Sequence, residues 1–381
     1  MQQIAMIWLI YRLTSSLVVL GFVGFLSQIP VLFLSPIAGV LADRVDKKKM
    51  LFITQLIYLF LAFLFFTLLL MNILHIPGLL VLVFLYGINS AFDMTARQSY
   101  FVELIDKKED LSNAIALNSV AFHGSRLIGP AIAGFIIKFW GESICFFLNG
   151  VSYIPFIIAL VLITSKHKKE AEAKISTVNK IKEGFAYILG HEVIFAVMVL
   201  VSIVSFMGMS YVVLLPAVVK TIFHSDSALL GIFMSSAGLG AFCGAILLAF
   251  KERITYLANT IRYCTFFLAV SLIGLPFTNS MAVAIVLLVV LGFNMMMILG
   301  GSHLILQTLT EHKYRGRVVS VYSMAFAGTI PIGNLINGYL SSTLGLQYTF
   351  LLCGIACLIG GLIFSLKTKA VKHRIESAYN N

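Results

Sequence analysis

Long uncharged runs of apolar residues alternate with short charged segments along most of this chain. A hydrocarbon core about 30 Å thick is crossed by about 20 helical residues. At that length the pattern predicts eleven membrane-spanning helices, at 18–42, 51–72, 79–98, 113–137, 144–164, 193–216, 228–250, 260–277, 281–304, 318–341 and 347–366. Residues 1–13 are equally apolar but too short to cross a membrane. The pattern therefore predicts an all-α integral membrane protein.

Composition supports lipid as the solvent for most of the chain. Of 381 residues, 60% are hydrophobic and only 11% are charged, whereas a typical soluble domain carries about 25% charged residues. The net charge of +11 does not indicate nucleic-acid binding, because the basic residues lie in short bursts between apolar runs and not on one face or tail. None of the five cysteines has metal-ligand spacing with a histidine, so no metal or cofactor is expected.

The distribution of Lys and Arg predicts the orientation in the membrane. Alternation places six segments on one side: 43–50, 97–110, 166–192, 251–262, 311–317 and the chain from 367 onward. They hold 23 of the 27 Lys and Arg residues, the excess that marks cytoplasmic loops. Of the other four, Arg12, Lys138 and Lys220 lie at the opposite ends of spans, and Arg126 lies within one. We therefore expect a multi-pass protein of a bacterial-type inner membrane, with loops 43–50 and 166–192 and the C-terminus in the cytoplasm.

Alternation also has a consequence for the first residues of the chain. It places residues 14–17 outside, so a complete helix is expected before them, and 1–13 supply about half of one. We expect a parent of twelve spans, with about 11.5 present and a truncated first helix. The predicted division is a first bundle over 1–165, a cytoplasmic linker over 166–192, a second bundle over 193–366 and a cytoplasmic tail over 367–381.

An internal repeat supports this division into two halves. "AFHG" at 121–124 recurs as "AFAG" at 325–328, and the glycines at 124, 129 and 134 recur at 328, 333 and 338, all with an offset of 204. One span earlier, "GIN" at 87–89 matches "GFN" at 292–294 with an offset of 205. Agreement across neighbouring spans indicates two parallel halves of six spans each.

Two motifs resemble those of a known transporter family. "GVLADRVDKKK", residues 39–49, resembles the loop signature of the major facilitator superfamily at Gly39, at the Asp43–Arg44 pair and at the basic cluster with Lys47 and Lys48. It differs at Asp46, where the usual pattern has glycine. "GSRLIGPAIAG", residues 124–134, resembles the antiporter signature of facilitator exporters, which is carried here by Gly124, Gly129, Pro130 and Gly134.

Further stretches extend the resemblance over nearly the whole chain. "QQIAMIWLIYRLT", "FDMTARQSYFVELI" and "YRGRVVSVYS" are similar to the subgroup that contains enterobactin exporters and macrolide efflux proteins. The resemblance implies a major facilitator fold, with two six-helix bundles that rock around a central cavity. It also implies a secondary active transporter, usually driven by proton antiport, that exports a small molecule by alternating access and works as a monomer in the lipid bilayer.

Sequence features narrow the class of activity. No phosphate-binding loop of the form G-x-x-x-x-G-K-[ST] occurs, and no clustered acids or Ser/His/Asp grouping suggests an enzyme. Apart from Asp93, no acidic residue lies well inside a predicted span, which argues for a neutral or anionic substrate. The resemblance implies a small hydrophobic or anionic molecule, such as a siderophore or a macrolide-like drug. The alternative is an inactive, truncated paralogue that acts as a membrane interaction protein, because the first helix lines the cavity in the family.

The family resemblance assigns the loop at 43–50 a gating role. Asp43 would accept hydrogen bonds from the start of the eleventh helix, near Val318, and this contact, called the clasp below, would close the cytoplasmic side. Arg44 would contact Asp93, which shares a helical face with Arg97, four residues further on. The other interpretation is a charge cluster that only sets the topology.

The fifth helix carries a polar stripe at Ser119, His123 and Arg126, spaced by four and three residues. An arginine this deep in a span faces protein or water, not lipid. Two interpretations stay open for Arg126, namely a structural ion pair or carbonyl clamp, and contact with an anionic substrate. His123 is either a titrating group near neutral pH or a hydrogen-bonded packing residue.

Other polar residues within spans are candidates for the cavity wall. Asn334 and Asn337 form a stripe in the eleventh helix that either lines the cavity or joins helices. The remaining candidates are Gln28, Asn149 and Asn294. The glycines of the fifth and eleventh helices allow close helix packing, which the family uses to seal the cavity, and Pro130 bends its helix.

Overall fold

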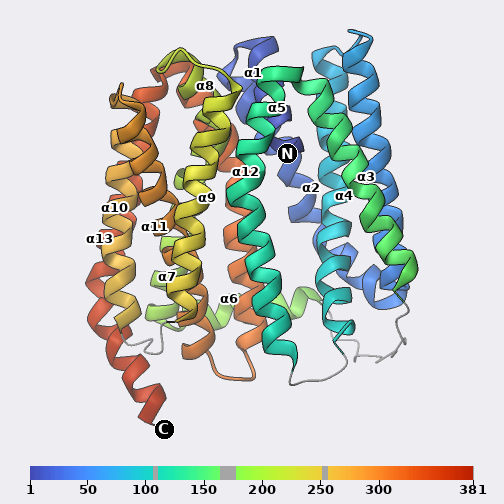
Figure 1. The fold of residues 1–381 in the computed structure, drawn as a ribbon. Coiled ribbons are helices and arrows are strands. Elements are labelled where there is room, and N and C mark those ends of the chain that lie inside the picture. Colours follow the sequence, from blue (N-terminus) through green and yellow to red (C-terminus); the bar gives the residue numbers. More distant parts are fainter. Residues whose placement is uncertain (106–109, 164–176, 251–255, 381) are drawn as a thin grey trace.

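The computed structural model of the chain consists of helices joined by short links (Figure 1), and it describes residues 1–105, 110–163, 177–250 and 256–380. The helices are α1 Gln2–Thr14, α2 Leu17–Arg44, α3 Lys47–Leu70, α4 Ile76–Glu103, α5 Leu111–Leu162, α6 Thr177–Leu189, α7 Glu192–Ile203, α8 Tyr211–Thr221, α9 Ser227–Ala249, α10 Leu257–Gly274, α11 Met281–Leu309, α12 Arg315–Leu344 and α13 Leu346–Asn380. A π-helix, Val204–Gly208, joins α7 to α8, and a 3-10 turn, Leu275–Phe277, extends α10.

The predicted spans coincide with these helices. In the described ranges, ten helical segments are long and apolar enough to cross a membrane. One of them is α5, which contains two spans because Gly141, at φ 83° and ψ 169°, reverses the chain in the middle of it. Glycine takes such positive φ angles without steric cost. Each of the eleven predicted spans is therefore helical, residues 1–13 form the short α1, and α13 continues through the predicted tail.

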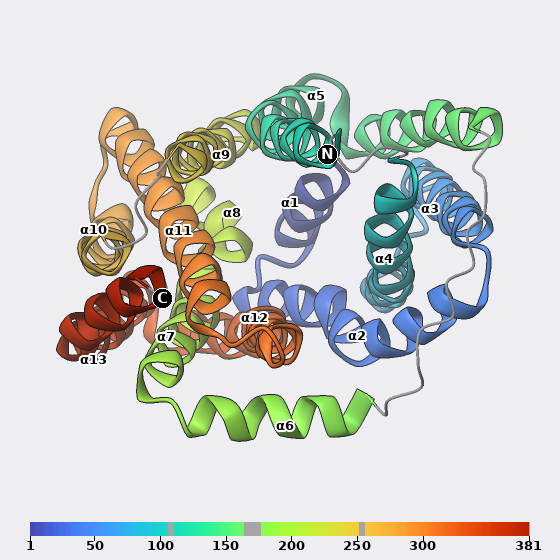
Figure 2. The same cartoon turned by 90° about the horizontal axis from the view of Figure 1, so that it is seen from below.

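The helices form two bundles that meet along two seams. The first bundle contains α1 to α5, and the second contains α7 to α13. The seams are formed by α2 against α12 and by α5 against α9 (Figure 2). We call the end of the molecule where α2 begins and α12 ends the closed end, and the opposite end, where α2 ends and α12 begins, the open end. This arrangement confirms the predicted two-bundle fold.

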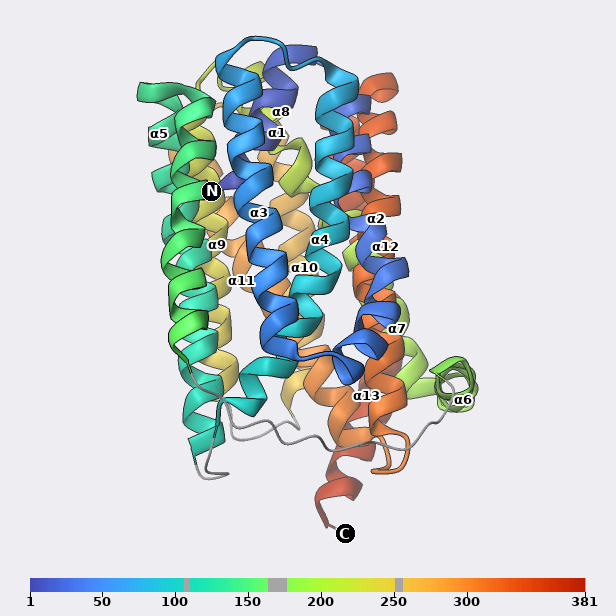
Figure 3. The same ribbon diagram turned by 90° about the vertical axis from the view of Figure 1, so that its right-hand side faces the viewer.

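The predicted linker contains the amphipathic helix α6. It runs across the bundle axis at the open end (Figure 1) and is seen end-on in Figure 3. Glu183 of α6 forms an ion pair with Arg317 near the start of α12. A Cβ on Gly184 would lie only 2.9 Å from the Arg317 carbonyl oxygen, so the two backbones are in close contact. The linker therefore packs against the first turn of α12.

Near the closed end of both seams, pairs of glycines face each other. A Cβ on Gly21 would lie 2.8 Å from the Gly338 Cα, and a Cβ on Gly134 would lie 2.8 Å from the Gly231 Cα. Gly134 and Gly338 are the glycines that the internal repeat relates. The two seams thus use the same backbone-to-backbone contact, which a side chain would prevent.

The open end lacks such contacts at the motif glycines. A Cβ on Gly39, Gly124 or Gly129 would meet no atom within 4 Å. The α5 backbone nevertheless stays close to α9 below Gly134, because a Cβ on Gly238 would lie 2.4 Å from the Arg126 carbonyl oxygen. At the closed end α1 and α2 also pack against α8 of the second bundle, whereas toward the open end Phe33 and Ile37 of α2 and Phe122 of α5 are exposed. The conformation is therefore closed at one end and open at the other.

The glycine contact predicts a clear difference between two variants of α5. Gly134→Ala places a methyl group 2.4 Å from the Ser227 carbonyl oxygen, and we expect it to destabilise the protein by about 1–3 kcal/mol. Gly129→Ala is the control, because it changes helix propensity in the same way while its methyl group meets no atom within 4 Å. Thermal unfolding of both variants in detergent checks this, and equal melting temperatures would contradict the role of the seam.

Candidate functional site

Arg126 of α5 lies between the bundles, at a depth where the α5 backbone is still in close contact with α9. The residue lies about 22 Å along the helix from Leu111. Its side chain is exposed, and the guanidinium lies 5.4 Å from the centroid of the Phe122 ring. The Arg126 carbonyl oxygen is the atom that Gly238 of α9 approaches most closely. Arg126 also lies near Tyr211 of α8, in the second bundle. No described carboxylate forms an ion pair with it, so the predicted internal ion pair has no partner among the described residues.

His123 lies one turn before Arg126 and makes no hydrogen bond through Nδ1 within the described part of the chain. Its ring packs edge-on against Phe122, with 5.4 Å between centroids. Because three residues separate them on the helix, His123 and Arg126 share a face of α5. Toward the open end, this face therefore presents a cation and an imidazole.

The first bundle contains a buried polar network around Asp93. Its Oδ1 accepts hydrogen bonds from Gln55 Nε2 at 2.6 Å and from Thr54 Oγ1 at 3.1 Å. Its Oδ2 accepts from Arg97 at 3.0 Å, so the two residues that share a helical face form an ion pair. Asn89 Nδ2 donates to the Thr54 carbonyl oxygen at 2.9 Å. A carboxylate with this many donors is stable inside a bundle, and it joins α3 to α4.

The basic loop after α2 joins helices of the first bundle. Asp46, which stands where the family pattern has glycine, caps α3 by accepting a hydrogen bond from the Lys48 backbone N–H at 2.9 Å. Aspartate is a favourable residue at that position. Lys47 forms an ion pair with Glu103 at the end of α4. Lys48 Nζ donates to the Ile163 carbonyl oxygen at 2.7 Å, just after α5 ends.

The Asp43 side chain lies outside the described part of the structure, so its predicted contact with α12 stays a prediction. Arg44 is exposed, and no ion pair or hydrogen bond links it to Asp93 among the described residues. Gly39 has open space beside it. With the open end in this state, the loop contacts of Lys47 and Lys48 lie within one bundle.

Asn337 of α12 joins that helix to the π-helix between α7 and α8. Its Nδ2 donates to Ser210 Oγ at 2.9 Å and to the Phe206 carbonyl oxygen at 3.3 Å. A π-helix turns carbonyl groups out of the regular hydrogen-bond ladder, and Asn337 provides a donor for one of them. Gly333, one turn earlier, allows the close approach to the same Phe206 oxygen. Of the two roles predicted for Asn337, the contacts are those of an interhelical bond.

The other polar candidates within spans are also mostly buried. Asn334 is 2% exposed in the α2–α12 seam, beside Gly24, and its amide has no partner among the described residues. Asn294 donates to the Val290 carbonyl oxygen of its own helix at 2.7 Å. Asn149 donates to Gln2 Oε1 at 2.6 Å and so joins α5 to α1. Gln28 is half-buried on α2.

An ion pair connects the two bundles at the closed end. Lys138 of α5 lies 3.0 Å from Asp226 Oδ2, at the start of α9. Beside it, Ser227 Oγ donates to the Gly134 carbonyl oxygen at 3.1 Å. Partial burial on its own raises the pKa of Asp226, but hydrogen bonds from Lys138 and from the Ala228 backbone N–H outweigh it, so this pKa lies below its ordinary value. The ionised carboxylate is therefore favoured in this conformation.

The other two basic residues at the closed end also have partners. Lys220 of α8 lies over the Trp8 ring of α1, 5.6 Å from the centroid, which is a second contact between the bundles. Arg12 forms an ion pair with Glu142 at 2.7 Å within the first bundle. We call the two contacts between bundles, Lys138–Asp226 and Lys220–Trp8, the closed-end latch. The three basic residues at the sparsely charged ends of spans thus hold this end together.

Two six-helix bundles joined along two symmetry-related seams are the architecture of the major facilitator superfamily. Solved structures agree: a bacterial homologue of the lysosomal transporter Spinster, inward-facing and occupied, has a TM-score of 0.68 at 13% identity and covers 97% of this chain and 95% of its own. The nucleoside transporter NupG has a TM-score of 0.68 at 12% identity, covering 96% of each chain. The family model described as transmembrane secretion effector matches residues 1–379, and the chain belongs to this family.

The chain is similar to curated transport proteins over nearly the whole length of both. The staphyloferrin A transporter of Staphylococcus aureus is 26% identical over 99% of this chain and 94% of the relative. Macrolide efflux protein A of Streptococcus pyogenes is 22% identical over 92% and 88%. The multidrug efflux pump Tap of Mycolicibacterium fortuitum is 24% identical over 94% and 90%. These findings confirm the predicted superfamily and subgroup, a multi-pass membrane transporter and not an enzyme.

Sequence reasoning missed several polar residues of these networks. Asn89 lies four residues before Asp93, so helical spacing was the available signal for it. The signal for Gln55 was a polar residue that interrupts an apolar run. Asp226 gives no such signal, because an acid in a short link is usually solvated. Its partner Lys138 did stand out, as an exception to the charge bias.

The latch predicts a measurable coupling between two charges. Lys138→Met and Asp226→Asn should each shift the conformational equilibrium away from the closed state at this end, and the double variant should add little. We expect a coupling of about 0.2–1 kcal/mol, because the pair is partly exposed. The distance between spin labels on the closed ends of α5 and α9, measured by double electron–electron resonance, checks this.

The pH dependence of that equilibrium provides an internal control. Because the pKa of Asp226 is lowered in the closed state, the stabilisation is complete above the ordinary aspartate pKa, about 3.9, and is lost as the pH falls further. Asp226→Asn should lack this acid transition. An unchanged transition in that variant, or additive single effects, would exclude the latch.

Proposed function

We propose that the chain is a proton-coupled exporter of a small anionic or hydrophobic molecule, of the siderophore or macrolide type, that works as a monomer by alternating access. The observation that carries the proposal is the exposed Arg126 guanidinium between the bundles, which no described carboxylate neutralises. An arginine in such a place attracts an anionic group of a substrate. The exposed Phe122 beside it offers an apolar surface to the rest of the molecule.

Charge distribution supports an orientation with the open end in the cytoplasm. The links between α2 and α3 and between α11 and α12 lie at that end, and they belong to the segments that hold 23 of the 27 Lys and Arg residues. In this orientation the conformation faces inward, and an exporter in this state receives its substrate from the cytoplasm or the inner leaflet. The relatives that are a siderophore transporter and efflux proteins support export.

The transport cycle follows from which contacts are fixed and which are reversible. The Asp93 network and the Asn337 bonds lie within single bundles, so they persist while the bundles move. The glycine seams and the closed-end latch lie between bundles and must separate when the outer side opens. The clasp of Asp43 with the start of α12 then holds the cytoplasmic side shut. Proton coupling rests on the likeness of 124–134 to the antiporter signature.

The role of the Arg126 charge is tested with two substitutions, one that keeps the positive charge and one that removes it. Arg126→Lys keeps the cation and Arg126→Gln removes it, so we expect export of an anionic substrate to fall about tenfold in the glutamine variant and much less in the lysine variant. The measurement is accumulation of labelled staphyloferrin A and erythromycin in expressing cells, with and without a protonophore, at matched protein levels. Equal export by Arg126→Gln and the unmodified chain would refute an anion-binding role, and insensitivity to the protonophore would refute proton coupling.

The clasp is tested with two neighbouring aspartates. Asp43→Asn removes the anion that would meet the start of α12, and we expect slower export together with a larger inward-facing population. Asp46→Asn removes the same charge three residues further along the loop. Asparagine caps a helix as well as aspartate does, so this control should export normally. Unchanged export by the Asp43 variant would leave the loop as a topology signal.

A further inference from the structure

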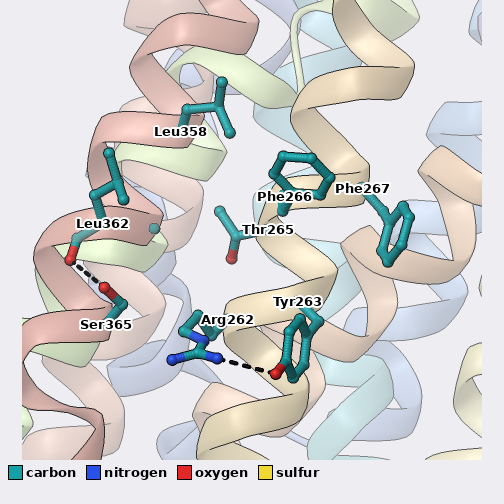
Figure 4. Close-up of a pocket in the computed structure, with 9 residues that line it drawn as sticks. Arg262, Tyr263, Thr265, Phe266, Phe267, Leu358, Leu362 and Ser365 are labelled. Atoms are coloured by element: carbon teal, nitrogen blue, oxygen red, sulfur yellow. Dashed lines mark hydrogen bonds between the residues drawn. The ribbon is translucent and has the colours of Figure 1, made fainter.

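A groove outside the transport seams lies between α10 and α13 (Figure 4). Its volume is about 460 Å³, within the range of ligand-binding pockets. Arg262 and Ser365 lie at one end, and Leu358 and Phe266 lie at the other. The groove therefore has a polar end and an apolar end.

The packing of the two helices explains where the groove lies. A Cβ on Gly354 would lie 2.4 Å from Ile273 Cγ1, and a Cβ on Gly361 would lie 2.8 Å from Thr265 Cγ2. The glycines of α13 thus bring it against α10 along this stretch. Arg262 lies one turn from Thr265, toward the open end, beyond these close contacts.

The groove lies on a bilayer-facing surface. Phe266 is 53% exposed and Leu362 is 65% exposed, although both are in membrane-spanning helices. Figure 2 shows α10 and α13 at the edge of the molecule, far from both seams. A water-soluble ligand does not reach such a surface, whereas a lipid chain lies against it.

The charge at the polar end is not balanced by an acid in the described structure. The Arg262 guanidinium donates a hydrogen bond to the Tyr263 hydroxyl at 3.0 Å and lies 4.8 Å from the same ring. No described carboxylate forms an ion pair with it. In contrast, Lys367, at the same end of α13, is paired with Glu192 at 2.6 Å. An arginine near a helix end at the membrane surface binds an anion when no protein acid neutralises it.

We propose that this groove binds an anionic phospholipid from the leaflet at the open end. The lipid phosphate accepts hydrogen bonds from the Arg262 guanidinium, and the Tyr263 hydroxyl, which accepts from Arg262, has its own proton to donate. One acyl chain follows the apolar wall of Phe266, Leu358 and Leu362. The site is independent of the proposed substrate path, because Arg126 lies between the bundles on α5.

The test is native mass spectrometry of the full chain in detergent, titrated with phosphatidylglycerol or with phosphatidylcholine of the same acyl chains. We expect the unmodified chain to prefer phosphatidylglycerol, and Arg262→Gln to lower its affinity about tenfold while the affinity for phosphatidylcholine stays the same. Arg315→Gln removes an exposed arginine at the same end of the molecule, outside the groove, and should change neither affinity.

A second variant keeps the charge and fills the apolar end. Leu358→Trp should weaken binding of both lipids at this site, with Arg262 unchanged, and melting temperatures in lipid-free detergent establish that each variant is folded. Glycerol phosphate, which has the anion but no acyl chain, should not compete. Equal binding of the two lipids by the unmodified chain, equal loss in the Arg262 and Arg315 variants, or competition by glycerol phosphate would overturn the proposal.

Discussion

Backbone contact between facing glycines is the interaction on which the rest of this structure depends. In lipid, two apolar helices gain little by leaving the solvent, so close van der Waals packing must hold them together. Gly21 meets Gly338 in one seam, and Gly134 meets Gly231 in the other. Because these contacts involve backbone atoms, a side chain at either glycine would separate the two bundles there. A transporter that rocks between two states needs such a contact, which is tight but contains no interlocked side chains.

Polar groups divide according to whether they lie within a bundle or between bundles. Within the first bundle, Asp93 has a donor for each carboxylate oxygen, and within the second, Asn337 bridges α12 to the π-helix. Such satisfied groups make each bundle a rigid unit, because breaking them leaves a buried polar atom without a partner. Arg126, by contrast, lies between the bundles beside Phe122. The same chemistry thus serves structure in one place and, in our proposal, recognition in the other.

Charge has two functions along this chain. The large group of Lys and Arg residues on one set of loops biases insertion, and Lys47 and Lys48 also join helix ends there. The few basic residues at the opposite ends have individual partners instead, as in Lys138 with Asp226 and Lys220 with Trp8. A partly exposed pair of this kind contributes little to stability, which suits a contact that has to break in each cycle.

Length and hydropathy by themselves determined the spans, because the thickness of a bilayer sets how long an apolar helix must be. The internal repeat indicated the two halves, and the motifs at 39–49 and 124–134 carried the resemblance to the superfamily. Only the tertiary structure decided what individual residues contact. Gly124 and Gly134 belong to one motif, yet one faces open space and the other the backbone of α9. Asn149 forms a hydrogen bond with Gln2, although most of the sequence of the first bundle separates them. Asp46 caps α3 where the family pattern has glycine. Helical periodicity determines which residues share a face, but the neighbour of that face depends on how distant helices pack, and this information is not local.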